Sequence, residues 1–369
     1  MKVLYNYLPF EFESNRKIFI EWKKLIKTTD FTLGHKVTEF EKKFSKFIGM
    51  KYCISTNNGT DALKLCLKSL KIKKGDEVIT VANTFYATVG AIVECGAKPV
   101  LVDCDDRYQI DINEIKKKIS NKTKVIIPVH WGGASPDMFK IMKIANKNKI
   151  YVIEDACMGI GAKIKKRSPG TFGKVNAFSM HPLKSLNVMG DGGMVVTNDK
   201  KTYEWLKMYR NHGMLNRDKI NFWGVNARLQ PLQAVVAIEG LKKLNKTINI
   251  RNTNAKYMDK LLGELGNNVV LPIRPKDYKE TYALYMCLVK KRDRLIKFLN
   301  MNGIEAKIHY PIPLNKQKAS KIFNLNQENF IRCNLQAKSL ITLPIHQYLT
   351  KQHIFYTYKT IKKFYQNNL

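Results

Sequence analysis

The chain of 369 residues is poor in acidic side chains, with 30 Asp and Glu against 64 Lys and Arg, and its formal net charge is +34. An excess of this size is often a sign of nucleic-acid binding, because lysine and arginine neutralise phosphates. Here the lysines are spread over almost every segment, only 11 of the 64 basic residues are arginine, and no nucleic-acid-binding motif accompanies them. We therefore interpret the charge as solvation of the surface and predict no nucleic-acid partner, although a positive field can steer an anionic substrate towards its site.

Cysteine motifs and long apolar runs are also missing. The seven cysteines form neither Cys-x-x-Cys pairs nor Cys/His clusters, which predicts no metal site. Their odd number and apolar neighbours are typical of reduced, buried thiols in a cytosolic protein. The first residues lack the apolar run of a signal peptide, and no stretch approaches the roughly 20 apolar residues of a transmembrane helix. We expect a cytoplasmic protein that does not contact a membrane.

Regular alternation of strand and helix patterns begins near residue 36. Strand patterns occur at residues 52–56, 75–81, 98–104, 124–131, 149–157, 176–180 and 192–198, and helical patterns lie among them, for example at 37–49 and 83–96. Short apolar strands that alternate with helices predict an α/β fold, with a mostly parallel sheet covered by helices on both faces. Ligands of such sheets bind beyond the carboxyl ends of the strands.

The pattern changes after a long helical stretch from about residue 231 to 265. A strand at 283–290, a helix at 292–303 and a strand at 304–310 follow, which predicts a smaller α+β unit. We therefore predict a large domain of residues 1–249, with the N-terminal segment, and a small C-terminal domain of residues 250–369.

Three polar features of the large domain lie at strand ends. Asn58-Gly59-Thr60 opens a helix, where glycine lets the backbone approach a ligand and free N–H groups can bind an anion. Glu154-Asp155 closes an apolar strand, and Lys184 precedes a Gly-Asp-Gly-Gly turn. Each feature alone has an ordinary explanation: a turn, a helix cap, or one more surface lysine.

The three features make chemical sense as one site. Pyridoxal phosphate needs an anion cradle for its phosphate, a carboxylate that keeps its pyridine nitrogen protonated, and a lysine that carries it as a Schiff base. Cradle, carboxylate and lysine occur in that order along the chain, each at a strand end. The pattern predicts a pyridoxal-phosphate site with Lys184 as its nucleophile.

The chain resembles the sugar aminotransferases of the DegT/StrS family, fold-type I pyridoxal-phosphate enzymes that act on nucleotide-linked keto sugars. Ten segments carry the resemblance in family order across residues 34–314, among them GTDALKL, GDEVITVANTFYATVGAIVECGAKPVLVD, VIEDACMGIGA, AFSMHPLK, GDGGMVVTND and GIEAKIHYPIPL. The resemblance implies a large domain with a mostly parallel sheet plus a smaller C-terminal domain.

Roles follow for the matching residues. The resemblance implies that Lys184 carries the cofactor and moves protons, and that Asp155 pairs with the protonated pyridine nitrogen. It places Gly59, Thr60 and Ser179 at the phosphate.

Two further matches concern the cofactor ring and a second subunit. The resemblance implies that Phe85 stacks on the ring. It also implies that Asn226 reaches the phosphate from the neighbouring subunit, and therefore an obligate homodimer with shared active sites.

This chain departs from the family pattern at some positions. Asn58 replaces a small hydroxyl residue, and Met158 stands where a glutamine ordinarily contacts the phenolic oxygen of the cofactor, a hydrogen bond that a thioether cannot donate. Asn315 stands where histidine is common.

Other polar residues near the motifs are candidates for substrate contact. We predict such contacts for His181, Tyr310 and Asn315. For His181, packing beside the site without contact to the substrate is an equal alternative. His130 and Trp131 are predicted to pack behind the site.

The resulting hypothesis is a transaminase that moves an amino group, with glutamate as the expected donor, onto a keto carbon of a nucleotide-linked sugar through a pyridoxamine phosphate stage. The Gly-Asp-Gly-Gly turn resembles members that act at C3 more than those that act at C4. The product would feed a surface polysaccharide, O-antigen or glycoconjugate.

Two alternatives stay open. One is a dehydratase of the same family, although its members carry histidine where this chain has Lys184. The other is a non-catalytic regulator or nucleic-acid-binding protein, suggested by the charge of +34.

Overall fold

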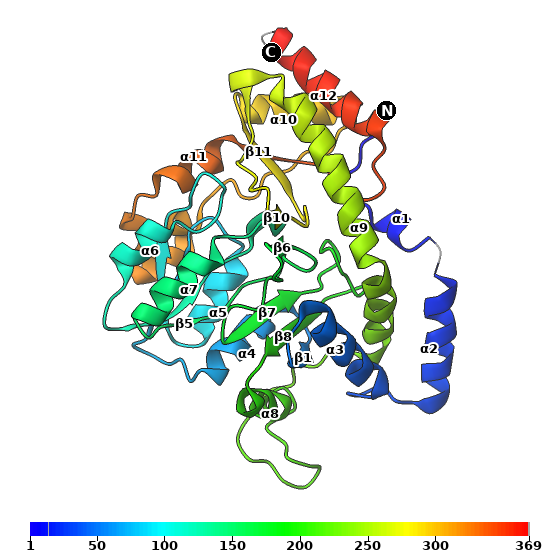
Figure 1. Ribbon diagram of the computed structural model, residues 1–369, viewed down its shortest axis with the longest axis vertical. Coiled ribbons are helices and arrows are strands. Elements are labelled where there is room, and N and C mark those ends of the chain that lie inside the picture. The colour runs from blue at the N-terminus through cyan, green and yellow to red at the C-terminus, as the bar shows by residue number, and fades with distance from the viewer. Residues whose placement is uncertain (14, 368–369) are drawn as a thin grey trace.

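A computed structural model describes residues 1–13 and 15–367. Its centre is a sheet in the order β3-β2-β4-β5 continued by β7-β8-β1. Figure 1 labels β5, β7, β8 and β1 of this sheet. The strands are β1 (Tyr52–Thr56), β2 (Glu77–Val81), β3 (Lys98–Val102), β4 (Thr123–Ile127), β5 (Tyr151–Val152), β7 (Val175–Ser179) and β8 (Gly193–Thr197). Single parallel bridges from Asp155 to Val129 and to Ala177 join the two parts. Only β8 runs antiparallel to its neighbours in this sheet, as the predicted mostly parallel sheet requires.

Helices cover both faces of the sheet, which confirms the predicted α/β layering. On one face, α4 (Gly59–Ser69), α5 (Tyr86–Glu94) and α8 (Lys200–Tyr209) pack over residues such as Val78 and Val195. On the other, α3 (His35–Ile48), α6 (Ile112–Lys118), α7 (Met138–Lys147) and the first half of α9 (Pro231–Gly263) pack over the alternate residues, including Ile79 and Val196. Burial of alternate residues on opposite faces is what a covered parallel sheet demands.

A second, smaller sheet lies at the far end of α9, in the order β12-β11-β9. Its strands are β9 (Val269–Val270), β11 (Tyr285–Val289) and β12 (Leu340–Leu343), and they pack with α10 (Arg292–Met301) and α12 (Lys351–Gln366). The N-terminal segment lies beside this sheet, because Val3 pairs with Ile304. The helix α9 crosses the predicted boundary at residue 249 without a break, and the boundary stays a prediction.

The remaining elements are short or peripheral. They include α1 (Leu8–Glu11), α2 (Arg16–Thr28), which packs on α9, α11 (Ile331–Ser339), and the two-stranded ribbon of β6 (Lys163–Ile164) and β10 (Tyr278–Lys279). Among the described residues, no helix has the length and apolar composition needed to cross a membrane.

Two predicted strands are shorter than expected. Residues 304–310 form single bridges only, because Ile304 pairs with Val3 and Lys307 with Thr342, two partners in different segments. The strand predicted at 149–157 is regular only at Tyr151–Val152. After that point the pairing continues only through the single bridges of Asp155 to Val129 and Ala177, and the side chains of Glu154 and Asp155 make separate contacts.

Glu154 anchors the loop that follows β5. Its buried carboxylate accepts hydrogen bonds from the N–H groups of Gly170 (2.8 Å), Phe172 (2.6 Å) and Gly173 (3.0 Å), and it pairs with His130 Nε2 at 2.9 Å. A buried carboxylate with four partners holds its surroundings firmly, because each partner loses a hydrogen bond if it leaves.

We expect Glu154→Ala to lower the free energy of unfolding by about 3 kcal/mol, since it leaves three buried N–H groups and a histidine without their acceptor. Urea denaturation followed by circular dichroism measures the change. Glu204→Ala is the matched control: the Glu204 side chain is 48% exposed and pairs with Lys207 at 3.7 Å, so a change below about 0.5 kcal/mol is expected. Equal losses in the two variants would contradict the anchoring role.

Candidate active site

A cavity of about 630 Å³ opens beyond the carboxyl ends of the sheet strands. This size lies in the range typical of small-molecule sites. It brings together nine residues predicted for the site: Gly59, Thr60, Phe85, Asp155, Met158, Ser179, His181, Lys184 and Tyr310. Residues from the N-terminal segment and from the C-terminal part complete the wall, including Tyr5, Tyr7, His309 and Ile345.

The N-terminus of α4 lines one end of the cavity. The Asn58 side chain caps the helix through Asp61 N (2.7 Å), while the N–H groups of Gly59 and Thr60 have no partner among the described residues. A Cβ on Gly59 would lie 2.7 Å from Ser179 Cβ, and one on Gly193 would lie 2.2 Å from the carbonyl oxygen of Asn58. Both positions therefore need glycine, and the result is a narrow cradle with free donors, suited to an anion.

Asp155 is fixed by both its backbone and its side chain. Its backbone bridges the two halves of the sheet. Its carboxylate accepts hydrogen bonds from Thr88 Oγ1 at 2.8 Å and from Cys157 N at 3.2 Å, and the residue is only 4% exposed. Each oxygen keeps a further lone pair, so the carboxylate can accept a proton-bearing nitrogen from the cavity.

Lys184 lies in the turn after β7, opposite Asp155. Burial lowers the pKa of its ammonium group, although the nearby Cys157 and Asp155 act in the other direction. A lysine with a lowered pKa has a larger fraction of neutral amine, which is the nucleophilic form. Its backbone is held by His181 O, which accepts from Lys184 N (2.8 Å), and by Tyr7, whose hydroxyl donates to Lys184 O (3.0 Å).

Aromatic rings form one wall. Phe85 precedes α5 as its N-cap residue and is 37% exposed, with its ring centroid 4.0 Å from that of Tyr86. The ring centroid of Tyr310 lies 6.1 Å from that of Phe85 and 5.7 Å from that of Trp131. Burial raises the pKa of Tyr310 to about 12, so its hydroxyl stays protonated and can donate at neutral pH.

Two histidines face the cavity. Burial lowers the pKa of His181, and Lys184 lowers it further. Burial also lowers the pKa of His309 to about 4, and its Nδ1 lies 3.0 Å from Thr342 Oγ1. His309 is therefore neutral at pH 7.

Met158 lines the cavity, and its carbonyl oxygen accepts from Thr281 Oγ1 at 2.7 Å. The histidine predicted to pack behind the site, His130, does so through Glu154 and Ser135. Its neighbour Trp131 instead forms part of the cavity wall.

Two predicted site residues lie outside the cavity. Asn315 is fully buried and its Nδ2 donates to Glu328 O at 2.8 Å, whereas its Oδ1 is buried without a hydrogen-bond partner among the described residues. Its predicted substrate contact stays a prediction. Asn226 is exposed, in the segment between α8 and α9, where it pairs with Asn211 in a single antiparallel bridge. Its predicted role in a neighbouring subunit stays a prediction.

The arrangement fits pyridoxal phosphate. The glycine cradle with free N–H groups suits a phosphate, the fixed carboxylate suits a protonated pyridine nitrogen, and a lysine of lowered pKa lies in the same cavity. The cofactor supplies an electron sink when bound. Asp155 would hold its ring charge, Lys184 would carry it and move protons, and Ser179 would join the cradle.

Sequence reasoning missed Thr88 and the N-terminal tyrosines. Thr88 is fully buried and its hydroxyl donates to Asp155. Thr84 Oγ1 lies 3.2 Å from Thr88 Oγ1. One signal was available for Thr88, a hydroxyl residue inside an otherwise apolar helix, one turn after Phe85. Tyr5 and Tyr7 carry no such signal, because only the chain fold brings them to the cavity.

Comparison with known proteins places this geometry in a family. The model of the DegT/DnrJ/EryC1/StrS aminotransferase family matches residues 14–362. The crystal structure of DesV from S. venezuelae in complex with a ketimine intermediate superposes with a TM-score of 0.95, at 29% identity over 98% of each chain.

Curated relatives agree in length as well. The chain is 35% identical to the UDP-2-acetamido-2-deoxy-3-oxo-D-glucuronate aminotransferase of Pseudomonas aeruginosa, over 89% of this chain and 90% of that one. It is 33% identical to a protein of Geobacillus stearothermophilus named pleiotropic regulatory protein, over 93% of both chains. With a fold-type I architecture, a cavity that fits pyridoxal phosphate and a family match over nearly its whole length, the chain belongs to the DegT/DnrJ/EryC1/StrS aminotransferase family.

Proposed function

We propose that this protein transfers an amino group from glutamate to a keto carbon of a nucleotide-linked sugar. The observation that carries the proposal is the presence of Lys184, Asp155 and the Gly59 cradle in one cavity. The relative from Pseudomonas aeruginosa, named for a 3-oxo sugar, supports C3 over C4 as the carbon that is aminated. Such a product is a precursor of surface polysaccharide, O-antigen or another glycoconjugate, made in the cytoplasm.

The rest of the cavity suits a large polar substrate. Tyr310, His181 and His309 offer a hydroxyl and two imidazoles to the cavity, and Phe85, Tyr86 and Trp131 offer aromatic faces against which a ring can pack. We infer that Tyr310 and His181 contact the sugar.

Charge in the cavity supports shared active sites. Lys184 is the only lysine or arginine among the described residues that line it, against three carboxylates, Asp61, Asp155 and Asp191. A nucleotide diphosphate or a dicarboxylic amino donor needs further cations. We infer that a second subunit supplies them from the loop that carries Asn226, which also bears Arg217 and Arg228.

The same loop has the surface of an interface. Trp223 is 88% exposed, Leu215 is 59% exposed and Ile220 is 53% exposed, and all three lie on the segment between α8 and α9 that also carries Asn226. Exposed apolar residues gathered on one protruding segment indicate a protein contact. We therefore propose a homodimer in which each loop completes the site of the other chain.

A screen of nucleotide-linked 3-keto and 4-keto sugars with glutamate tests the reaction. We expect 2-oxoglutarate to be released only when a 3-keto sugar is present, an amino sugar detected by mass, and its position settled by NMR. Lys184→Ala should lose both turnover and the visible absorbance of the lysine-bound cofactor, because no other amine lines the cavity.

Other outcomes of that screen favour the alternatives. Consumption of keto sugar without release of 2-oxoglutarate would support the dehydratase. Failure of the purified protein to bind pyridoxal phosphate would support a non-catalytic regulator, the role suggested by the name of the Geobacillus relative.

A cofactor titration tests the support that Thr88 gives to Asp155. Thr88→Val keeps the shape but removes the hydroxyl, and loss of a hydrogen bond to a buried carboxylate should weaken cofactor binding by about tenfold or more. The dissociation constant, read from visible absorbance, is the measurement. Thr88→Ser should bind nearly as well as the wild type; if it binds as poorly as Thr88→Val, packing of the methyl group is the cause instead.

A mixed dimer tests the shared site. Alone, Lys184→Ala should be inactive, and Asn226→Asp should lose about tenfold or more in activity, because a carboxylate would face the phosphate. A purified heterodimer of the two variants should recover about half of wild-type activity, since one of its two sites then contains both Lys184 and Asn226. A heterodimer with no gain over its parents would show that the site belongs to a single chain.

A further inference from the structure

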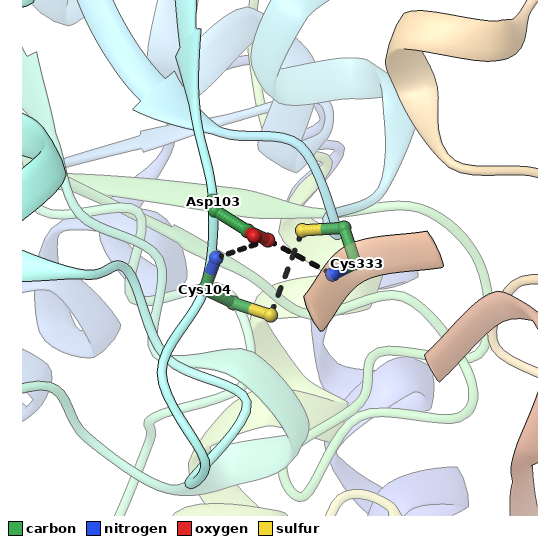
Figure 2. Close-up of side chains that lie close together, drawn as sticks. All are labelled: Asp103, Cys104 and Cys333. Carbon is green, nitrogen blue, oxygen red and sulfur yellow. Dashed lines mark hydrogen bonds between the residues drawn. The ribbon is translucent and has the colours of Figure 1, made fainter. Parts of the chain in front are cut away.

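Two cysteines from distant parts of the chain meet outside the active site. Cys104 follows β3 and Cys333 lies in the first turn of α11, 229 residues later, yet Cys333 Sγ donates to Cys104 Sγ over 3.5 Å (Figure 2). Both residues are at most 1% exposed. Neither thiol has a role in the proposed transamination.

Asp103 fixes the backbone of both cysteines. Its Oδ1 accepts from Cys104 N (2.9 Å) and Cys333 N (2.8 Å), and its Oδ2 accepts from Arg332 N (2.9 Å). The carboxylate thus caps the start of α11 and ties it to the end of β3, as Figure 2 shows. One carboxylate therefore holds both backbones beside each other, with the two sulfur atoms 3.5 Å apart.

Both sulfur atoms lie near the Asp103 carboxylate, and the sulfur of Cys104 in addition accepts a hydrogen bond from a side-chain amide. Gln336 Nε2 donates to Cys104 Sγ at 2.9 Å, and Gln336 Oε1 accepts from Asn83 Nδ2 at 2.6 Å. An N–H donor favours negative charge on the sulfur that accepts it. Cys104 is therefore the better nucleophile of the pair. Burial also raises the pKa of Cys333, which suits a thiol that reacts second.

We propose that Cys104 and Cys333 form an oxidative modification site, at which a small peroxide converts the two thiols to a reversible disulfide. The Cys104 thiolate attacks hydrogen peroxide, the O–O bond breaks, and Cys104 sulfenic acid and hydroxide form. The Cys333 sulfur then attacks the Cys104 sulfur; the S–O bond breaks, the S–S bond forms, and the oxygen leaves as water with the Cys333 proton. In balance, two thiols lose two hydrogen atoms and peroxide is reduced to two molecules of water.

Burial sets the class of oxidant. A bulky disulfide such as oxidised glutathione must reach a sulfur in line, whereas both sulfurs lie inside the packed contact between β3 and α11. Peroxide is about the size of two water molecules and needs only a small opening. We therefore expect peroxide to act where oxidised glutathione does not.

A metal ion explains the cluster less well. The donor atoms of Asp103, Cys104 and Cys333 lie within 4.8 Å of one another. However, three backbone N–H groups already engage the carboxylate. Two sulfur atoms alone fall short of the four donors that structural zinc sites use.

Peptide mapping of the full-length holoenzyme tests the proposal. The protein is treated with dilute hydrogen peroxide, its free thiols are blocked, and it is digested without reductant. We expect one cross-linked peptide pair that contains Cys104 and Cys333, lighter by two hydrogen atoms and absent after dithiothreitol. Five of the seven thiols (seven minus two) should still react after denaturation. The oxidised protein should melt several degrees higher, because the bond closes a long loop.

Variants make the result specific. Cys104→Ala and Cys333→Ala should each abolish the cross-link, whereas Cys287→Ala, a buried cysteine of the small sheet, should leave it unchanged. Three outcomes would overturn the proposal. They are seven reactive thiols after peroxide treatment, a cross-link between a different pair of cysteines, and efficient cross-linking by oxidised glutathione alone. One equivalent of zinc in the purified protein that both variants lose would also overturn it. The mapping on unmodified protein needs no variant, so poor folding of a variant leaves the test intact.

Discussion

The position of Asp155 is the constraint on which the site depends. Its backbone pairs with Val129 on one side and Ala177 on the other, and so joins the two parts of the large sheet. Its carboxylate, held by Thr88 and Cys157, points into the cavity between them. Fold and chemistry share one residue here. Any shift that misaligned the two parts of the sheet would also displace the carboxylate that we expect to pair with the cofactor ring.

The two adjacent acidic residues have different roles, because successive side chains of an extended chain point to opposite sides. Glu154 points away from the cavity, into a loop whose N–H groups it binds, and Asp155 points into the cavity. The loop that Glu154 holds packs beneath the site, because Gly170 lies against Phe178, one residue before Ser179. Glu154 thus supports the cradle from behind, and its charge is stabilised by donors that Asp155 does not need.

Much of this arrangement could be predicted from the sequence, because strand ends of a parallel sheet converge. That rule was sufficient for Gly59, Asp155 and Lys184, each of which follows a short apolar strand. Contacts that depend on tertiary packing were not predictable in this way. Asn315 is predicted to contact the substrate, but the structure places it outside the cavity lining, with its Nδ2 donating to Glu328 O. Tyr7 contacts the Lys184 backbone only because the N-terminal segment crosses to the far sheet.

The contrast between the chain and its cavity has a chemical reason. The surface carries most of a net charge of +34, whereas the described residues that line the cavity include a single primary amine, that of Lys184. An aldehyde cofactor reacts with any neutral amine, so a second lysine in the cavity would compete with Lys184 and divert the cofactor from the correct geometry. A phosphate held at the start of α4 by backbone N–H groups, as we propose, would avoid that competition, because amide nitrogens are not nucleophiles. The surface lysines can attract an anionic substrate at long range. Among the described residues that line the cavity, Lys184 then provides the one amine that the substrate encounters.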